Sequence, residues 1–151
     1  TGLAVTTLEC LGLTGSPVLN AMLGMPPDRY DFHVARCGGA QLAMAFSVND
    51  INSTRDLFRS LKWPKGETRL IYNHRADRPG RFHSFIEWLS QAQWREVLII
   101  GDKPRKRPAA ARYLKVKDEQ GLLRLFKPGD RVFGCGNIAG IPLSLAASLG
   151  R

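Results

Sequence analysis

The stretch Leu-Ile-Tyr-Asn-His-Arg-Ala-Asp-Arg-Pro-Gly-Arg, residues 70–81, is the most informative part of the sequence. Its apolar beginning predicts a buried strand, which ends abruptly in three arginines, an aspartate and a Pro-Gly turn. In open α/β sheets ligands bind at the carboxyl ends of the strands, and guanidinium groups match carboxylates and phosphates. The stretch therefore predicts an anion-binding loop that follows a buried strand.

Strands and helices alternate on both sides of this stretch. Ser53 is expected to cap the first helix of the alternating region, with Asp56 at the reciprocal position. Such alternation indicates an α/β fold with a Rossmann-like, mostly parallel sheet and helices on both faces. The apolar patterns predict strands at 41–48, 69–72, 96–100 and 131–134, and helices at 53–61, 81–93, 109–114, 119–126 and 138–149.

The first 39 residues differ from this alternating region. Residues 1–24 carry apolar positions at helical spacing and predict a short helical segment. Residues 25–39 contain Pro26-Pro27 and Gly38-Gly39, and are expected to form a linker because proline cannot continue a helix. The α/β domain is then expected over 40–151.

Length and cysteine content favour one reduced domain. A chain of 151 residues is long enough to bury roughly two-thirds of its unfolded surface without disulfides. Its three cysteines are widely spaced and form no zinc motif, so we expect no metal site and a reducing, cytoplasmic compartment. No apolar stretch approaches the ~20 residues of a membrane span. The chain begins with Thr1, so we expect a fragment or a processed piece.

The charge is strongly basic, with 22 lysines and arginines against 13 acidic residues and a net charge of +9. This predicts attraction to a polyanion, which could be nucleic acid, anionic lipid or an acidic polymer. A dense cluster comprises Lys103, Arg105, Lys106 and Arg107. We expect this cluster, together with the arginines of 75–81, to bind an acidic polymer, although a solvated surface explains it equally well. No aromatic residue interrupts this basic run, and no RNA-binding or zinc-finger motif is present, so no specific nucleic-acid partner is expected.

Polar or glycine-rich loops follow all four predicted strands. They begin at Asn49, Asn73, Gly101 and Gly134, and in a parallel sheet they should converge on one edge. The last loop places Gly134, Gly136 and Gly140 where a phosphate-binding loop is expected. Its spacing differs from the usual Gly-x-Gly-x-x-Gly, so tight packing is the favoured explanation.

Several single residues allow two interpretations. Asp50 could bind ribose hydroxyls, or it could cap a turn together with Asn49. His74 could be a base, although a packed histidine is the more common case. Arg75, Arg78 and Arg81 are stronger candidates as anion ligands, and Asp77 could hold two of them in place.

The combination of three motifs is more specific than any one of them. It resembles the C-terminal half of the ligase subunit of poly-γ-glutamate synthase (PgsB/CapB type), a branch of the Mur ligase superfamily. The resemblance runs from about residue 1 to the end of the chain. The motifs are Phe-Ser-Val-Asn-Asp-Ile-Asn-Ser-Thr at 46–54, Ile-Tyr-Asn-His-Arg-Ala-Asp-Arg at 71–78 and Gly-Cys-Gly-Asn-Ile-Ala-Gly at 134–140.

The resemblance implies the C-terminal domain of an ATP-dependent ligase that polymerises glutamate. Residues 1–24 would be the tail of a central ATPase domain, and 40–151 the Mur-type C-terminal domain. In this family a carboxylate is phosphorylated to an acyl phosphate, and an amino group then attacks it to form an amide. Asp50 with Asn49 would face the nucleotide. The residues facing glutamate or the polymer end would be Asn73, Arg75, Asp77, Arg78 and Asn137.

Two departures from the family pattern limit what this chain could do alone. Tyr-Asp-Phe-His at 30–33 stands where a nucleotide-contacting arginine is usual, so the expected substitute is His33, Arg29 or Arg36. The sequence also lacks a Gly-Lys-Ser/Thr phosphate loop and the magnesium ligands of the central domain. ATP and Mg²⁺ would therefore bind mainly through that domain, and this chain alone would carry no catalytic residue and be inactive.

The resemblance also implies partners and leaves alternatives open. The expected partners are glutamate or polyglutamate, the ATPase half of the ligase, and membrane subunits that would hold the enzyme at the inner face of the membrane. The alternatives are another amino-acid ligase of the superfamily, a basic nucleic-acid-binding module, or a structural half without chemistry.

Overall fold

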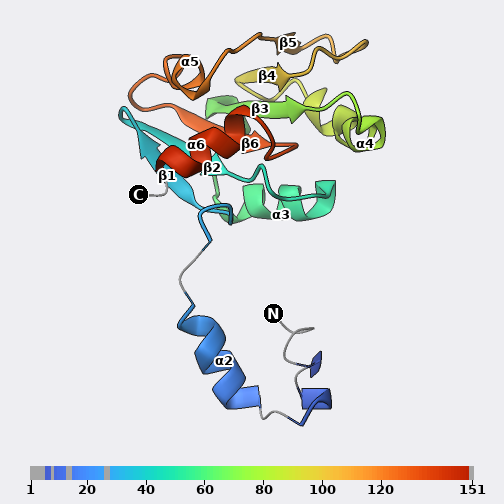
Figure 1. Ribbon diagram of the computed structural model, residues 1–151. Coiled ribbons are helices and arrows are strands. Elements are labelled where there is room, and N and C mark those ends of the chain that lie inside the picture. Colours follow the sequence, from blue (N-terminus) through green and yellow to red (C-terminus); the bar gives the residue numbers. More distant parts are fainter. Residues whose placement is uncertain (1–5, 8, 13–14, 26–27, 150–151) are drawn as a thin grey trace.

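The computed structural model describes residues 6–7, 9–12, 15–25 and 28–149. A six-stranded sheet with the order β1-β2-β6-β3-β4-β5 forms its centre (Figure 1). β1 is antiparallel to β2, and every other neighbouring pair is parallel. The mostly parallel α/β fold is therefore confirmed. The strands are β1 (Val34–Cys37), β2 (Ala40–Met44), β3 (Thr68–His74), β4 (Glu96–Gly101), β5 (Ala111–Tyr113) and β6 (Arg131–Cys135).

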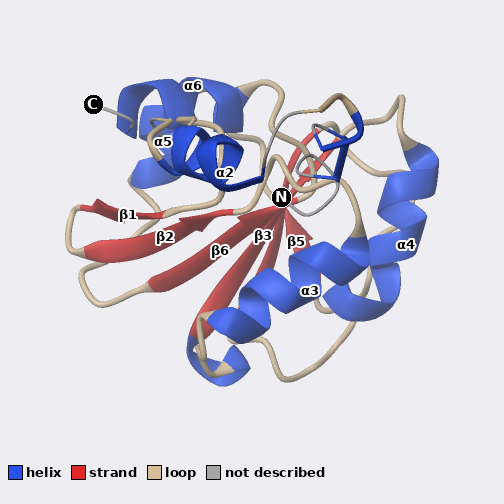
Figure 2. Cartoon of the chain, turned by 90° about the horizontal axis from the view of Figure 1, so that it is seen from below, coloured by secondary structure: helices blue, strands red, loops and turns tan. Residues whose placement is uncertain are grey.

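Helices cover both faces of the sheet, as expected (Figure 2). α3 and α4 pack on one face, and α5 and α6 pack on the other. α2 stands away from these layers in Figure 1. The helices are α2 (Gly15–Leu23), α3 (Ile51–Ser60), α4 (Pro79–Leu89), α5 (Glu119–Leu123) and α6 (Ile141–Leu149), and a 3₁₀ turn spans Lys65–Glu67.

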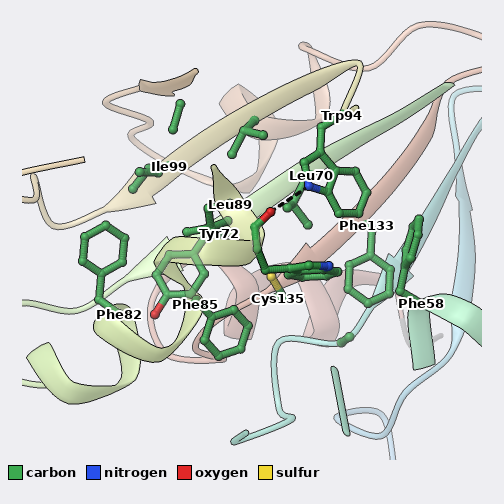
Figure 3. Packing of buried hydrophobic residues seen from close by; sticks show 14 of the residues in the cluster. Phe58, Leu70, Tyr72, Phe82, Phe85, Leu89, Trp94, Ile99, Phe133 and Cys135 are labelled. Atoms are coloured by element: carbon green, nitrogen blue, oxygen red, sulfur yellow. Dashed lines mark hydrogen bonds between the residues drawn. The ribbon is translucent and has the colours of Figure 1, made fainter. Parts of the chain in front are cut away.

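Alternation of side chains along the strands builds two cores. In β3, Leu70 and Tyr72 face the layer of α3 and α4, whereas Ile71 faces α5 and α6. Both faces are buried, which explains why the parallel strands are continuously apolar. Aromatic rings from both helices fill the first core with Phe133 and Trp94, whose indole N–H donates to the Trp88 carbonyl at 3.0 Å (Figure 3).

Two strands were not predicted from the sequence. The helix expected at 109–114 is wrong: residues 111–113 form β5, in which Ala111 is buried and Arg112 points to solvent and binds Glu96. A three-residue edge strand is too short to show its period. β1 lies inside the segment expected to be a linker, between its prolines and its glycines, and pairs with β2.

The N-terminal boundaries of the first elements also differ. α3 begins at Ile51, two residues before the expected start, and its cap is Asp50 rather than Ser53. The Asp50 carboxylate accepts the Ser53 amide at 2.8 Å, so the turn-capping interpretation holds for this residue. α2 falls within the expected helical segment 1–24. Residues 1–5, 8 and 13–14 of that segment lie outside the described residues, and its origin in an ATPase domain stays a prediction.

The position of β6 determines where a ligand could bind. β6 is the last strand in sequence, yet it lies between β2 and β3 at the centre of the sheet. The chain leaves β2 and β3 toward α3 and α4, but leaves β6 toward α6 on the other face. Connections that diverge to opposite faces open a crevice at the carboxyl ends of the strands, here on both sides of β6.

We predict that Gly134→Ala destabilises the protein through one specific clash. A Cβ atom at Gly134 would overlap the buried Phe46 ring, so the free energy of unfolding should fall by about 1–3 kcal/mol. Phe46→Leu makes room, so the double variant should lose less stability than the sum of the two single variants. Urea unfolding measures all three variants, and strict additivity would contradict the packing described.

Candidate functional site

Loops from four strands meet at the carboxyl edge of the sheet, as predicted. Hydrogen bonds join them in pairs: the β3 strand to the β6 loop, the β6 and β2 loops to α4, and the β4 loop to the β3 loop. Contact between segments so distant in sequence shows that the loops form one connected edge. The bonds that connect them show which predicted site residues are available to a ligand.

Asn73, at the end of β3, fastens the β6 loop. Its side chain is 4% exposed, and its amide nitrogen donates to the carbonyls of Asn137 at 2.7 Å and Ala139 at 2.8 Å. Asn137 in turn accepts the Ala139 amide at 2.9 Å through its own side chain. Both asparagines, predicted as substrate ligands, are thus engaged inside the loop, which gives them a positioning role.

Arg81, one of the three arginines predicted as anion ligands, links three elements. From the first turn of α4 it donates to the Gly136 carbonyl at 2.9 Å and to the Asn49 side chain at 2.7 Å. Asn49, predicted to face a nucleotide, is therefore engaged by this arginine. The arginine-rich composition of 70–81 signals a cationic loop, but it does not distinguish the arginine that holds the loops from the others.

The glycines of the β6 loop differ in their roles. At Gly136 the backbone has φ +101°, and a Cβ atom would lie 2.7 Å from the Asn73 carbonyl oxygen. Gly134 lies within β6 against Phe46. Tight packing, the favoured explanation, accounts for both. Gly140 has φ +73° and open space around it, and it directly precedes α6.

Arg75 and Asp77 form a pair in the β3–α4 loop. The Arg75 Nε donates to the carboxylate at 2.9 Å, and a second bond comes from Nη2. This hydrogen bonding raises the pKa of Arg75 and lowers the pKa of Asp77. Arg78 is exposed, and its side chain has no hydrogen bond or ion pair to the rest of the described chain. The loop therefore presents one oriented guanidinium and one free guanidinium.

Asp102 joins the β4 loop to the arginine loop, residues 75–78 between β3 and α4. Its carboxylate accepts the Ala76 amide at 2.8 Å, and its own amide donates to the His74 carbonyl at 3.0 Å. Gly101 makes this close approach possible, since its backbone has φ +80° and a Cβ atom would overlap the His74 carbonyl oxygen. The sequence predicted the loop, but not the bond from Asp102 that fixes the backbone beside Arg75.

The residues expected near a nucleotide are only partly brought together. Asp50 is exposed at the start of α3, and the hydrogen bond from the Ser53 amide lowers its pKa. His33 lies next to the carboxyl end of β2, where its carbonyl accepts the Met44 amide. Arg36 pairs with Gln41 near the start of β2, toward the opposite edge of the sheet, because β1 is antiparallel. The geometry thus separates Arg36 from the other candidates.

His74 is a packed residue with one unsatisfied atom. It is 6% exposed, its ring lies 4.5 Å from Phe82, and its Nδ1 is buried without a hydrogen-bond partner in the described structure. Burial lowers its pKa, against a smaller opposing effect of Asp102. The ring therefore stays neutral, as expected for packing.

The described residues contain neither a metal-ligand cluster nor a membrane-spanning helix. No group of three or more His, Cys, Asp or Glu side chains is placed to hold a metal ion. None of the helices in this part of the chain combines the length and apolar character needed to cross a bilayer. Cys37 and Cys135 are buried free thiols, and Cys10 is exposed.

Comparison with known families matches residues 30–151 to the poly-gamma-glutamate synthase CapB C-terminal domain. The chain belongs to this family. The family match begins before β1, so this CapB C-terminal domain includes the strand that the sequence placed in a linker. A search of the curated proteins found no match.

A solved structure shares the fold of this CapB C-terminal domain. It is a folylpolyglutamate synthase from Thermotoga maritima, superposed with a TM-score of 0.57 at 16% sequence identity. The alignment covers 99% of this chain but 38% of that protein. The chain therefore corresponds in length to little more than a third of that synthase. At this identity the likeness shows the fold alone.

We predict that Asn73→Ala loosens the β6 loop. It would leave two carbonyls without their donor, and should lower the free energy of unfolding by about 2–3 kcal/mol. Amide hydrogen exchange in 136–140 should accelerate as well. Asn137→Ala is the matched control, because it removes one bond and should cost only about 1 kcal/mol. Unchanged exchange in Asn73→Ala would contradict the fastening role.

We predict that stability falls with acid because of His74. Its pKa is lower in the folded protein than its ordinary 6.5, so the unfolded chain binds the proton first. Stability is complete above this value and decreases as the pH falls through it. His74→Phe keeps a ring on Phe82 and should flatten this dependence in urea unfolding at several pH values. An unchanged slope in His74→Phe would refute the assignment.

Proposed function

We propose that this domain completes the active site of an ATP-dependent ligase that joins glutamate units through amide bonds. Family membership supports a polyglutamate ligase domain. The observation that carries the proposal is the arginine loop, which lies at the carboxyl edge of the sheet beside the crevice around β6. Ligands bind at this edge in open α/β sheets.

The arginine loop is suited to a carboxylate. Arg75 is already oriented by Asp77, and the loop backbone is fixed by the bond from Ala76 to Asp102. Arg78 offers a second guanidinium with no internal partner among the residues described. Guanidinium groups bind carboxylates in a bidentate manner, and a fixed loop loses less entropy on binding. The two arginines would position glutamate or the end of the polymer.

The described residues fit only part of an ATP site. Asp50 is exposed and ionised at the end of the β2 loop, so it could accept hydrogen bonds from ribose hydroxyls. These residues contain no carboxylate cluster for Mg²⁺, so the phosphates and the metal would be held mainly by a preceding domain. ATP supplies the phosphoryl group that activates a carboxylate as an acyl phosphate. The residues of this chain would orient the nucleotide and the incoming amino acid.

This assignment also implies where the domain works. Its nearest partner would be the ATPase half of the ligase. Membrane subunits of a polymer synthase could place the complete enzyme in the cytoplasm at the inner membrane face. A ligase of the same superfamily that acts on another amino acid remains the closest alternative, since the arginine loop recognises a carboxylate and not a particular side chain.

The kinetics of the complete ligase test the arginine assignment. Arg75→Ala and Arg78→Ala should each lower kcat/KM for glutamate by roughly thirtyfold, equivalent to about 2 kcal/mol, because each removes a charged hydrogen-bond donor from the substrate. Arg59→Ala on α3 is the matched control, since its exposed pair with Asp56 lies outside the arginine loop. Steady-state rates at varied glutamate and fixed ATP provide the measurement. Unchanged kinetics in both loop variants would refute the assignment.

A further inference from the structure

A groove of about 660 Å³ opens beside the arginine loop, between α4 and the connection from β4 to β5. Its lining includes His74 and three members of the basic cluster noted in the sequence, Lys103, Arg105 and Lys106, but none of the residues expected to face glutamate or the nucleotide. Ala76, within the arginine loop, and Pro79, the first residue of α4, also line it, so the groove continues from the proposed substrate site. It lies on the α4 side of the sheet, away from the β6 loop.

One wall of the groove is apolar and comes from a single face of α4. Pro79, Phe82 and Ile86 stand one helical turn apart and all line the groove. His74 adjoins this wall against Phe82, with the unpartnered Nδ1 described above. A buried polar atom without a partner is costly, and a hydrogen bond to a ligand would satisfy it.

The opposite wall is cationic and held in place. Lys103, Arg105 and Lys106 line it, while Pro104 between them is buried and anchors the loop. The three cations are exposed and have no ion pair with any described residue, and no aspartate or glutamate lines the groove. Arg107 differs from them, because it donates to the Ala111 carbonyl at 2.8 Å.

The cations at the amino ends of the strands differ from those of this wall. There, Arg69 and Arg95 both bind Asp130, and Arg131 binds Glu67. Lys103, Arg105 and Lys106 instead line one groove without a paired carboxylate among the described residues. A groove with one apolar wall and one uncompensated cationic wall fits a ligand that carries methylene groups and repeated negative charges.

We propose that this groove binds the glutamate polymer beyond the unit held at the arginine loop. The inference rests on the proposed function. Each γ-linked glutamate carries one carboxylate and two methylene groups, so the polymer matches both walls. The carboxylates would face Lys103, Arg105 and Lys106, and the methylene groups would lie on the α4 wall.

A binding titration with the 151-residue chain tests the groove without ATP. The probe is a fluorescently labelled γ-linked glutamate oligomer, measured by anisotropy at rising salt. Lys103→Gln combined with Lys106→Gln should weaken binding about tenfold at physiological salt. The matched control is Lys115→Gln with Lys117→Gln, which removes the same charge from exposed positions outside the groove. It should weaken binding about twofold at most.

Two further arms make the test decisive. Ile86→Asp places a negative charge on the apolar wall and should also weaken binding, with thermal unfolding to verify that the variant is folded. A single-stranded oligonucleotide of matched charge should bind less tightly than the glutamate oligomer. Equal losses in both lysine pairs, or salt-resistant preference for the oligonucleotide, would overturn the proposal.

Failure of the groove can be told apart from failure of the ligase assignment. Loss of binding in the groove variants, together with a complete ligase that does not join glutamate, would leave the groove assigned and refute the proposed function. Conversely, suppose that Arg75→Ala lowers kcat/KM of the complete ligase as expected while the groove variants bind the polymer unchanged. That result would support the proposed function and refute the groove.

Discussion

The carboxyl edge of the sheet depends on two hydrogen bonds, which the side-chain amide of Asn73 donates to the carbonyls of Asn137 and Ala139. β6 enters the sheet last in sequence but occupies its centre, so the loop that follows it must be fixed against strands formed far earlier in the chain. Asn73 does this from β3, and Gly136 permits it by leaving room for the Asn73 backbone. Arg81 extends the same connection to the β2 loop.

Two groups of residues can therefore be distinguished at this edge: those that hold its loops together and those available to bind a ligand. Backbone groups and neighbouring loops are held by hydrogen bonds with the side chains of Asn73, Arg81 and Asp102. The side chains of Arg78, Lys103, Arg105 and Lys106 make no such bonds within the described chain, unlike Arg107. A polar residue buried at a strand end is therefore a weaker candidate ligand than an exposed one on a loop that others have fixed.

The sequence predicted the architecture better than the details of the edge. Buried parallel strands are recognisable in a sequence as continuous apolar runs. For this reason β3 and β4 were expected at nearly their true positions. β5 was mistaken for a helix because three residues cannot display a period, and β1 was hidden between proline and glycine pairs. The convergence of the loops followed from parallel topology, but which amide or guanidinium holds them depends on distances that no spacing in sequence encodes. Arg36 shows the same limit, since only the antiparallel pairing of β1 reveals that it points to the other edge.

In the arginine loop, Asp77 competes with a substrate carboxylate for the guanidinium of Arg75. A substrate carboxylate that approaches Arg75 meets a guanidinium in which two of the five N–H donors already bind Asp77, so it must use the other three or displace the aspartate. Arg78 has no such competitor. The two arginines therefore differ. Arg75 presents an oriented guanidinium with some of its N–H donors occupied, whereas Arg78 presents all of its donors on a freer side chain. An anion that bridges both would gain orientation from one and charge from the other. Because Ala76 lies between them and lines the groove beside α4, an elongated anion bound there would continue along the cationic wall.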